Sequence, residues 1–288
     1  MTFAALALLV VAAFLHAGWN LLAKRAADGG VVFVWLFAVV AALLYAPLVL
    51  VWVLLDPQPM SWPVWLCVAV SACLHIGYFL FLQSGYRYGD LSLVYPLARG
   101  TGPLLATVLA IVLLAERPSA LALAGAGLIV AGVFFITGGL QGLRSAAAPR
   151  VAIGYGLLTG VLIAAYTLVD KYAVATLLVA PLVYDWLGNA GRAVFMTALV
   201  WPRRGEIRSH WRRHRNAIVG VAVMSPLAYI LVLTALRFTP VSHVAPAREM
   251  SILVGVVLGA RLLDEGRMWS RLLAAAAIVA GIVALMLG

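Results

Sequence analysis

The chain has 288 residues, of which 65% are hydrophobic and 10% are charged, and its formal net charge is +10. A soluble domain is roughly half apolar and a quarter charged, so this composition excludes an ordinary water-soluble globule and indicates a membrane protein. The positive charge does not indicate nucleic-acid binding, because six of the twenty basic residues fall within 202–216 and most others lie at segment ends.

Ten apolar segments of the length that a membrane-spanning helix needs, about 20 residues, follow one another along the chain. They cover residues 3–23, 31–55, 62–85, 91–114, 119–139, 151–170, 179–201, 217–237, 241–262 and 269–287. The first segment has no basic n-region and has a counterpart in the second half. We therefore interpret it as a retained helix and not as a cleaved signal peptide.

The two halves of the chain repeat one another. The string from Ile129 to Val133 returns almost unchanged from Ile278 to Ile282, and each copy begins thirteen residues after a glutamate, Glu116 or Glu265. Upstream, four residues recur 150 positions later: Arg87, Ser92, Val94 and Pro96 return as Arg237, Ser242, Val244 and Pro246. The chain therefore divides into a first repeat (1–140), a connector (141–150) and a second repeat (151–288).

Each repeat contains five segments, an odd number, so the second copy must enter the membrane in the opposite sense to the first. The predicted fold class is an all-α integral membrane protein, with ten transmembrane helices as two inverted five-helix repeats. Fourteen of the loop Lys and Arg residues lie on one side and three on the other, which predicts a multi-pass inner-membrane protein with both termini outside the cytoplasm.

A polar stripe runs along the first segment, where His16 and Asn20 lie one turn apart with Trp19 beside them. The stripe is either a buried histidine satisfied by the backbone or a cavity wall that binds substrate. Polar side chains on other segments extend the candidate site: His75, Tyr78, Tyr166 and His243. A membrane histidine that titrates near neutral pH could couple transport to protons.

Two further sets of polar residues are expected to have other roles. Asp170 lies near the end of the sixth segment and is expected at the membrane interface. Asp185, Asn189 and Arg192 share one face of the seventh segment and predict a water-bridged polar track.

Arg99 and Glu249 occupy the same position in the two repeats, 150 residues apart. Charged residues that persist in spanning helices usually face a cavity or a partner. Two interpretations stay open: an interior salt bridge between the halves, or a site where Arg99 binds an anionic group and Glu249 an ammonium group. Tyr95 lies on the same helix face as Arg99, and Arg248 is a further candidate that points about 100° away from Glu249.

The order of these features resembles the drug/metabolite transporter superfamily, in its EamA branch. The matching features are the aromatic-polar-x-x-x-Lys endings Trp19 to Lys24 and Tyr166 to Lys171, the prolines Pro96 and Pro246, and the two turn glutamates. The stretch from His16 to Lys24 resembles a subgroup linked to phosphonate utilisation. The resemblance implies a transporter with both termini in the cytoplasm, contrary to the charge count.

Several function classes lack their motifs. The sequence has no Gly-x-x-x-x-Gly-Lys-Ser/Thr string for an ATP motor and no metal-binding or cofactor motif, and Cys67 and Cys73 fall on different helix faces. The prediction is therefore a secondary transporter, not an enzyme, that moves a small anionic or zwitterionic metabolite, such as an amino acid or aminophosphonate, by alternating access. The alternatives are a flippase or exporter of an anionic lipid or amphiphile, and a membrane enzyme acting on lipid phosphate. The sequence leaves monomer and homodimer open.

Overall fold

The computed structural model describes residues 1–58, 60–88, 91–136, 150–259 and 268–288, and all regular elements in this part of the chain are helical. The first repeat contains α1 (Phe3–Arg25), α2 (Gly30–Leu55), α3 (Trp62–Tyr88), α4 (Leu91–Leu113) and α5 (Ala120–Ile136). The second contains α7 (Arg150–Ala175), α8 (Pro181–Val200), α9 (Ile207–Phe238), α10 (Val241–Ala247), α11 (Met250–Gly259) and α12 (Met268–Leu287). Two short 3₁₀ helices, η1 (Ala27–Gly29) and η2 (Trp201–Glu206), join neighbouring helices.

The described helices confirm the all-α membrane fold. Five helical stretches are long and apolar enough to cross a membrane: Phe3–Ala23, Gly30–Leu55, Trp62–Leu82, Arg150–Ala175 and the run Pro181–Phe238, which contains both α8 and α9. Three shorter apolar helices accompany them, at Leu97–Leu113, Ala120–Phe135 and Leu273–Leu287. Large apolar side chains such as Leu43, Leu54 and Val112 are exposed on the outer faces, as expected where lipid is the solvent.

The start of α9 differs from the sequence expectation. The basic stretch 202–216 was expected to be a loop, but α9 begins at Ile207 and carries most of it as helix. This first part of α9 is held against the turn between α1 and α2, where the Asp28 carboxylate lies 3.2 Å from both Arg213 Nη1 and His214 Nε2. The buried face continues through Ala217, Ile218 and Val221, so tertiary packing and ion pairs extend the helix beyond its apolar part.

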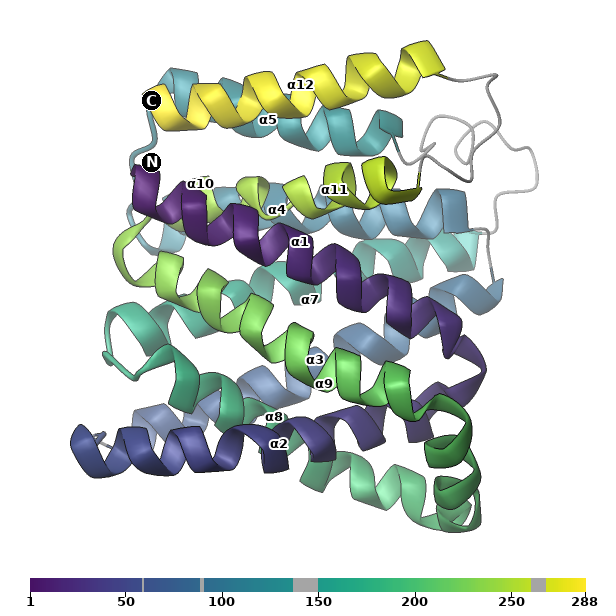
Figure 1. Ribbon diagram of the computed structural model, residues 1–288. Coiled ribbons are helices and arrows are strands. Elements are labelled where there is room, and N and C mark those ends of the chain that lie inside the picture. The colour runs from purple at the N-terminus through teal and green to yellow at the C-terminus, as the bar shows by residue number, and fades with distance from the viewer. Residues whose placement is uncertain (59, 89–90, 137–149, 260–267) are drawn as a thin grey trace.

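Equivalent helices of the two repeats run in opposite directions, as Figure 1 shows for α1 and α7. Both chain termini lie at the same end of the molecule, and the Met1 ammonium donates to the Leu285 carbonyl at 3.0 Å. The packing follows the same two-fold pattern. The pairs α2–α8 and α5–α12 each join equivalent helices, and the pair α1–α9 has its counterpart in α3–α7.

Two tryptophans form reciprocal hydrogen bonds between the equivalent helices α2 and α8. Trp35 of α2 donates from Nε1 to the Ala193 carbonyl of α8 at 3.1 Å, and Trp186 of α8 donates to the Ala42 carbonyl of α2 at 2.7 Å. Each indole therefore satisfies its polar edge on the other repeat. The two hydrogen bonds together connect α2 and α8 across the boundary between the repeats.

The duplicated Ile-Val-Ala-Gly strings lie where α5 and α12 pack closely against each other. Ile129 of α5 and Ile278 of α12 are both fully buried. A Cβ atom on Gly281 would lie 2.5 Å from the Gly125 carbonyl oxygen, and one on Gly132 would lie 2.8 Å from the Ala274 carbonyl oxygen. The two backbones approach so closely that only glycine fits, the close packing of small residues common between membrane helices.

The glutamate that precedes the string in the first repeat caps a helix of the second repeat. Glu116 accepts hydrogen bonds from the backbone N–H groups of Val241 at 2.7 Å and Ser242 at 2.9 Å, at the first turn of α10. These amide groups have no partner within their own helix. At the neighbouring end of α9, Lys171 donates from Nζ to the Leu236 carbonyl at 2.6 Å and to the Thr239 carbonyl at 3.0 Å.

The predicted ninth helix is discontinuous. Residues Arg248 and Glu249 form a turn between α10 and α11, two residues after Pro246, which cannot donate a backbone hydrogen bond. Arg248 thus lies at the carboxyl end of α10 and Glu249 at the amino end of α11. Backbone hydrogen bonds continue across this turn, from Arg248 N–H to the Val244 carbonyl at 3.0 Å and from Ile252 N–H to the Glu249 carbonyl at 2.9 Å.

Candidate functional site

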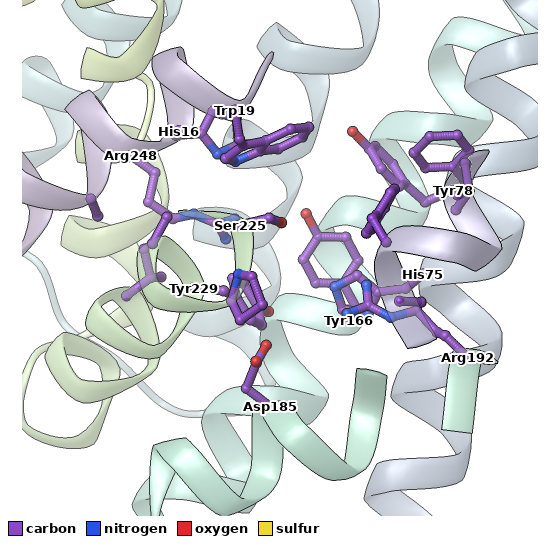
Figure 2. A pocket seen from close by; sticks show the side chains of 18 of the residues that line it. His16, Trp19, His75, Tyr78, Tyr166, Asp185, Arg192, Ser225, Tyr229 and Arg248 are labelled. Carbon is purple, nitrogen blue, oxygen red and sulfur yellow. The ribbon is translucent and has the colours of Figure 1, made fainter. Parts of the chain in front are cut away.

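A cavity of about 120 Å³ lies between the two repeats. Its walls come from helices of both halves, while α5 and α12 contribute none of the described lining residues. The polar and aromatic side chains that line it are His16, Trp19, Phe37, His75, Tyr78, Phe79, Arg99, Tyr166, Asp185, Arg192, Ser225, Tyr229 and Arg248. Figure 2 shows that most of these side chains converge on the same space.

The cavity brings together most of the candidate residues. Seven of the predicted residues line it: His16, Trp19, His75, Tyr78, Arg99, Tyr166 and Arg248. Asn20 does not, because it is exposed and its amide donates to the His16 carbonyl of its own helix at 2.7 Å. His243 is buried in the first turns of α10 and is also absent from the lining. The side chain of Tyr95 lies outside the described residues.

Arg99 and Glu249 form a buried ion pair. Arg99 Nε lies 3.0 Å from Glu249 Oε2, and the two side chains are 9% and 3% exposed. Arg99 also donates from Nη2 to the Ser251 hydroxyl of α11 at 3.3 Å. Arg99 lines the cavity, whereas Glu249 is not among the lining residues. The pair therefore connects α4 to the break in the ninth helix and presents only its cationic member to the cavity.

Arg248 packs against an aromatic wall. Its guanidinium lies 5.4 Å from the centre of the Tyr229 ring, within the range of a cation–π contact. Among the described residues it has no ion-pair partner. Tyr229 contacts the Tyr166 ring edge-on at 6.4 Å, and Tyr166 stacks on His75 at 4.0 Å. Figure 2 shows Arg248 beside Tyr229, with Tyr166 and His75 grouped together.

The face shared by Asp185, Asn189 and Arg192 on α8 forms a direct chain of hydrogen bonds. Asn189 donates to Asp185 Oδ2 at 2.9 Å, and Arg192 donates to Asn189 Oδ1 at 2.7 Å. A water-bridged track was expected, but the asparagine takes the bridging position. Asp185 and Arg192 both line the cavity, so this chain adds one acid and one base to its wall.

Asp170 was expected at the membrane interface, but it is completely buried. Its Oδ1 accepts from the Tyr184 hydroxyl at 2.7 Å, and its Oδ2 accepts a short hydrogen bond from the Tyr229 hydroxyl. The expectation was wrong because Asp170 lies on the inward face of α7, which carries the side chain between α8 and α9. Its sequence neighbour Lys171 turns instead to the end of α9.

The two polar lining residues of α9, Ser225 and Tyr229, were not among the candidates. They lie one turn apart beside Pro226, which interrupts the hydrogen bonds of α9. The only sequence signal for them is this spacing of two polar residues at i and i+4 in an apolar segment. That signal is weak, because one hydroxyl and one phenol are common in spanning helices.

Comparison with known proteins agrees with the fold and its duplication. A family model described as "EamA-like transporter family" matches residues 3–138 and again residues 150–287. A solved structure titled "Crystal structure of protein" is similar in fold, with a TM-score of 0.76 over 100% of this chain and 98% of its own, at 18% sequence identity. A search of curated proteins found no match. Since the family model matches both repeats and so nearly the whole chain, this protein belongs to the EamA-like transporter family.

Proposed function

We propose that this transporter moves a small anionic or zwitterionic metabolite through the cavity between its repeats. The observation that carries the proposal is Arg248, a cavity-lining cation held by an aromatic ring and without an ion-pair partner among the described residues. Arg99 is paired with Glu249, and Arg192 is bonded to Asn189. Arg248 is therefore the cation best placed to bind a carboxylate or phosphonate.

The composition of the wall supports a zwitterion more than a simple anion. Asp185 lines the same cavity and can receive an ammonium group. The aromatic side chains Trp19, Tyr78 and Tyr166 cover the carbon skeleton of a bound molecule, as is usual in small-molecule sites. An amino acid or an aminophosphonate carries both charges and matches this arrangement.

We further propose that transport proceeds by alternating access around this cavity. The turn between α10 and α11 places two charged residues at an interruption of a helix inside the bundle, and interrupted helices are common in secondary transporters built from inverted repeats. Pro226 lies within α9 beside the cavity. These interruptions are positions where helices can bend while the closely packed α5–α12 pair holds the repeats together.

A thermal-shift screen of the purified protein tests the substrate class directly. The probes are 2-aminoethylphosphonate, L-alanine, inorganic phosphate and choline, each measured with the wild type and with Arg248→Gln. We expect the zwitterions to stabilise the wild type and to lose most of this effect in the variant. Stabilisation by choline alone, or equal stabilisation of the variant, would contradict an anion site at Arg248.

Uptake into sealed proteoliposomes then separates a carrier from the alternatives. A carrier of soluble metabolites gives accumulation of the stabilising probe that disappears when the vesicles are made leaky. Movement of a fluorescent anionic phospholipid between leaflets, without uptake of any soluble probe, would favour a flippase. Turnover of a lipid phosphate in leaky vesicles would favour an enzyme.

A further inference from the structure

Asp170 is a buried carboxyl group that the proposed binding site does not use. It lies on α7 with no accessible surface, and among the described residues it has no ion-pair partner. Its oxygens are held instead by the hydroxyl groups of Tyr184 and Tyr229. A carboxylate in an apolar interior is costly unless it is paired, hydrogen-bonded or neutralised by a proton.

A second, smaller cavity lies beside the side chains that surround this carboxyl group. It has a volume of about 20 Å³, and its lining includes Ser71, Tyr184 and Tyr229, which are the side chains beside Asp170. The same small cavity is lined by His75, Asp185 and Arg192, which also line the main cavity. A space of this size is large enough for one water molecule. Tyr184 and Tyr229 separate Asp170 from this space, so a proton from the small cavity would reach the carboxyl group through a tyrosine hydroxyl.

Tyr229 links the carboxyl group to the substrate cavity. Its hydroxyl donates to Asp170, and its ring supports the Arg248 guanidinium. When Asp170 is an anion, both tyrosine hydroxyl groups can donate to it. When one oxygen gains a proton, the carboxyl group loses part of its acceptor capacity and its new O–H group needs an acceptor, which a neighbouring tyrosine hydroxyl can provide. Protonation of Asp170 thus changes how Tyr229, and through it Arg248, is held.

We propose that Asp170 is the proton-coupling site of this transporter: it exchanges its proton through the hydroxyl groups of Tyr184 and Tyr229, and its protonation state reaches the substrate cavity through Tyr229 and Arg248. The inference rests on the proposed transport function. The step is a proton transfer: a proton from water in the cavity binds one carboxylate oxygen, forms the carboxylic acid, and later returns to water on the other side of the membrane. This assigns the coupling role to an aspartate, in place of the histidines that the sequence indicated.

Several other titratable side chains lie near Asp170 and must be distinguished from it in any titration. The charged and titratable side chains that face it come from three helices and the break in the ninth helix: Cys67 and His75 of α3, Tyr184 and Asp185 of α8, Tyr229 of α9, and Arg248. Of these, Asp185 is the other carboxyl group, and it is bonded to Asn189. Asp185→Asn is therefore the matched control for Asp170→Asn.

Infrared titration of the reconstituted protein tests the site without any substrate. We expect a buried carboxylic-acid band that appears and disappears with pH in the wild type, is lost in Asp170→Asn, and is kept in Asp185→Asn. Tyr229→Phe should shift this band, because the carboxyl group loses one hydrogen-bond partner. Absence of a titrating band, or its loss in Asp185→Asn with retention in Asp170→Asn, would overturn the assignment.

Transport of 2-aminoethylphosphonate in proteoliposomes tests the coupling. Asp170→Asn should retain exchange of the probe at equal pH on both sides and should lose accumulation driven by a pH gradient. Accumulation by this variant at the wild-type level would overturn the coupling role. Absence of exchange by the wild type would count against the proposed substrate class instead, and the infrared result would still decide whether Asp170 takes up a proton.

Discussion

Arg99 and Glu249 occupy equivalent positions in the two repeats, and their side chains meet with Arg99 Nε 3.0 Å from Glu249 Oε2. The repeats therefore carry opposite charges at this equivalent position, and the two side chains form an ion pair that links the repeats. This geometry supports the salt-bridge interpretation for the pair. It also leaves Arg99 in the cavity wall, so a structural and a binding role can coexist in the arginine.

A charge swap separates these two roles. Arg99→Ala and Glu249→Ala should each lower the stability of the protein by about 3–5 kcal/mol, because each leaves a buried charge without its partner. The double variant Arg99→Glu with Glu249→Arg should regain most of the thermal stability. It should not regain probe uptake, because the cavity wall then carries the acid. Full recovery of uptake in the swap would show that Arg99 has no part in binding.

Arg248 should determine ligand affinity more than stability. Hydrogen bonds to charged groups contribute about 1.5–3 kcal/mol, so Arg248→Gln should weaken binding of an anionic probe by roughly 10–100-fold. The matched control is Arg237→Gln, an exposed arginine at the end of α9. Calorimetric titration of both variants measures the difference. Equal affinities in the two variants would remove Arg248 from the binding site.

The Glu116 cap should stabilise the start of α10. Glu116→Ala removes the acceptor of two backbone hydrogen bonds across the repeat boundary, and loss of a helix cap costs about 0.5–2 kcal/mol. Arg117→Ala, at the exposed neighbouring position, should change the melting temperature little. Thermal unfolding followed by intrinsic fluorescence compares the two. A larger loss in Arg117→Ala than in Glu116→Ala would contradict the capping role.

An added carbon at Gly281 should destabilise the contact between α5 and α12. The Cβ atom of Gly281→Ala would meet the Gly125 carbonyl oxygen at 2.5 Å, so the helices would have to separate. Overpacking of this kind costs about 1–3 kcal/mol. Gly127→Ala on α5 is the control, because a Cβ atom there meets nothing within 4 Å. Similar melting temperatures for the two variants would show that the helices can move apart freely.

The distribution of basic residues predicts the orientation of the protein. A C-terminal alkaline phosphatase fusion should be active and a C-terminal fluorescent fusion of the cytoplasmic type inactive, because the basic first turns of α9 lie at the end of the molecule opposite to the termini. Neutralising the six arginines between 202 and 216 should weaken this preference. The reverse pattern of fusion activity would support the orientation that the family resemblance implies.

The amino-acid sequence alone was enough to predict the fold class and the duplication. The bilayer requires about 20 apolar residues for each spanning helix, so the crossings can be recognised without any tertiary contact. The repeat is visible because both copies retain the residues that pack and cap the frame, Glu116 and the Ile-Val-Ala-Gly strings among them. The sequence also identified several residues of the cavity wall, because each is a polar side chain inside an apolar segment: Arg99, Arg248, His75 and Tyr166.

Only the tertiary structure decided how these residues act. Asp170 and Tyr229 are separated by 59 positions, and nothing in either helix by itself reveals that the tyrosine hydroxyl meets the buried carboxyl group. The same holds for the helical start of α9, which depends on Asp28, and for the assignment of Arg99 to the cavity wall and Glu249 to the interior. The length and apolarity of a spanning helix are set by the lipid around it, so the sequence reveals them. The partners of a buried polar group depend instead on the rotation and depth of the neighbouring helices, which are set by packing across the whole bundle.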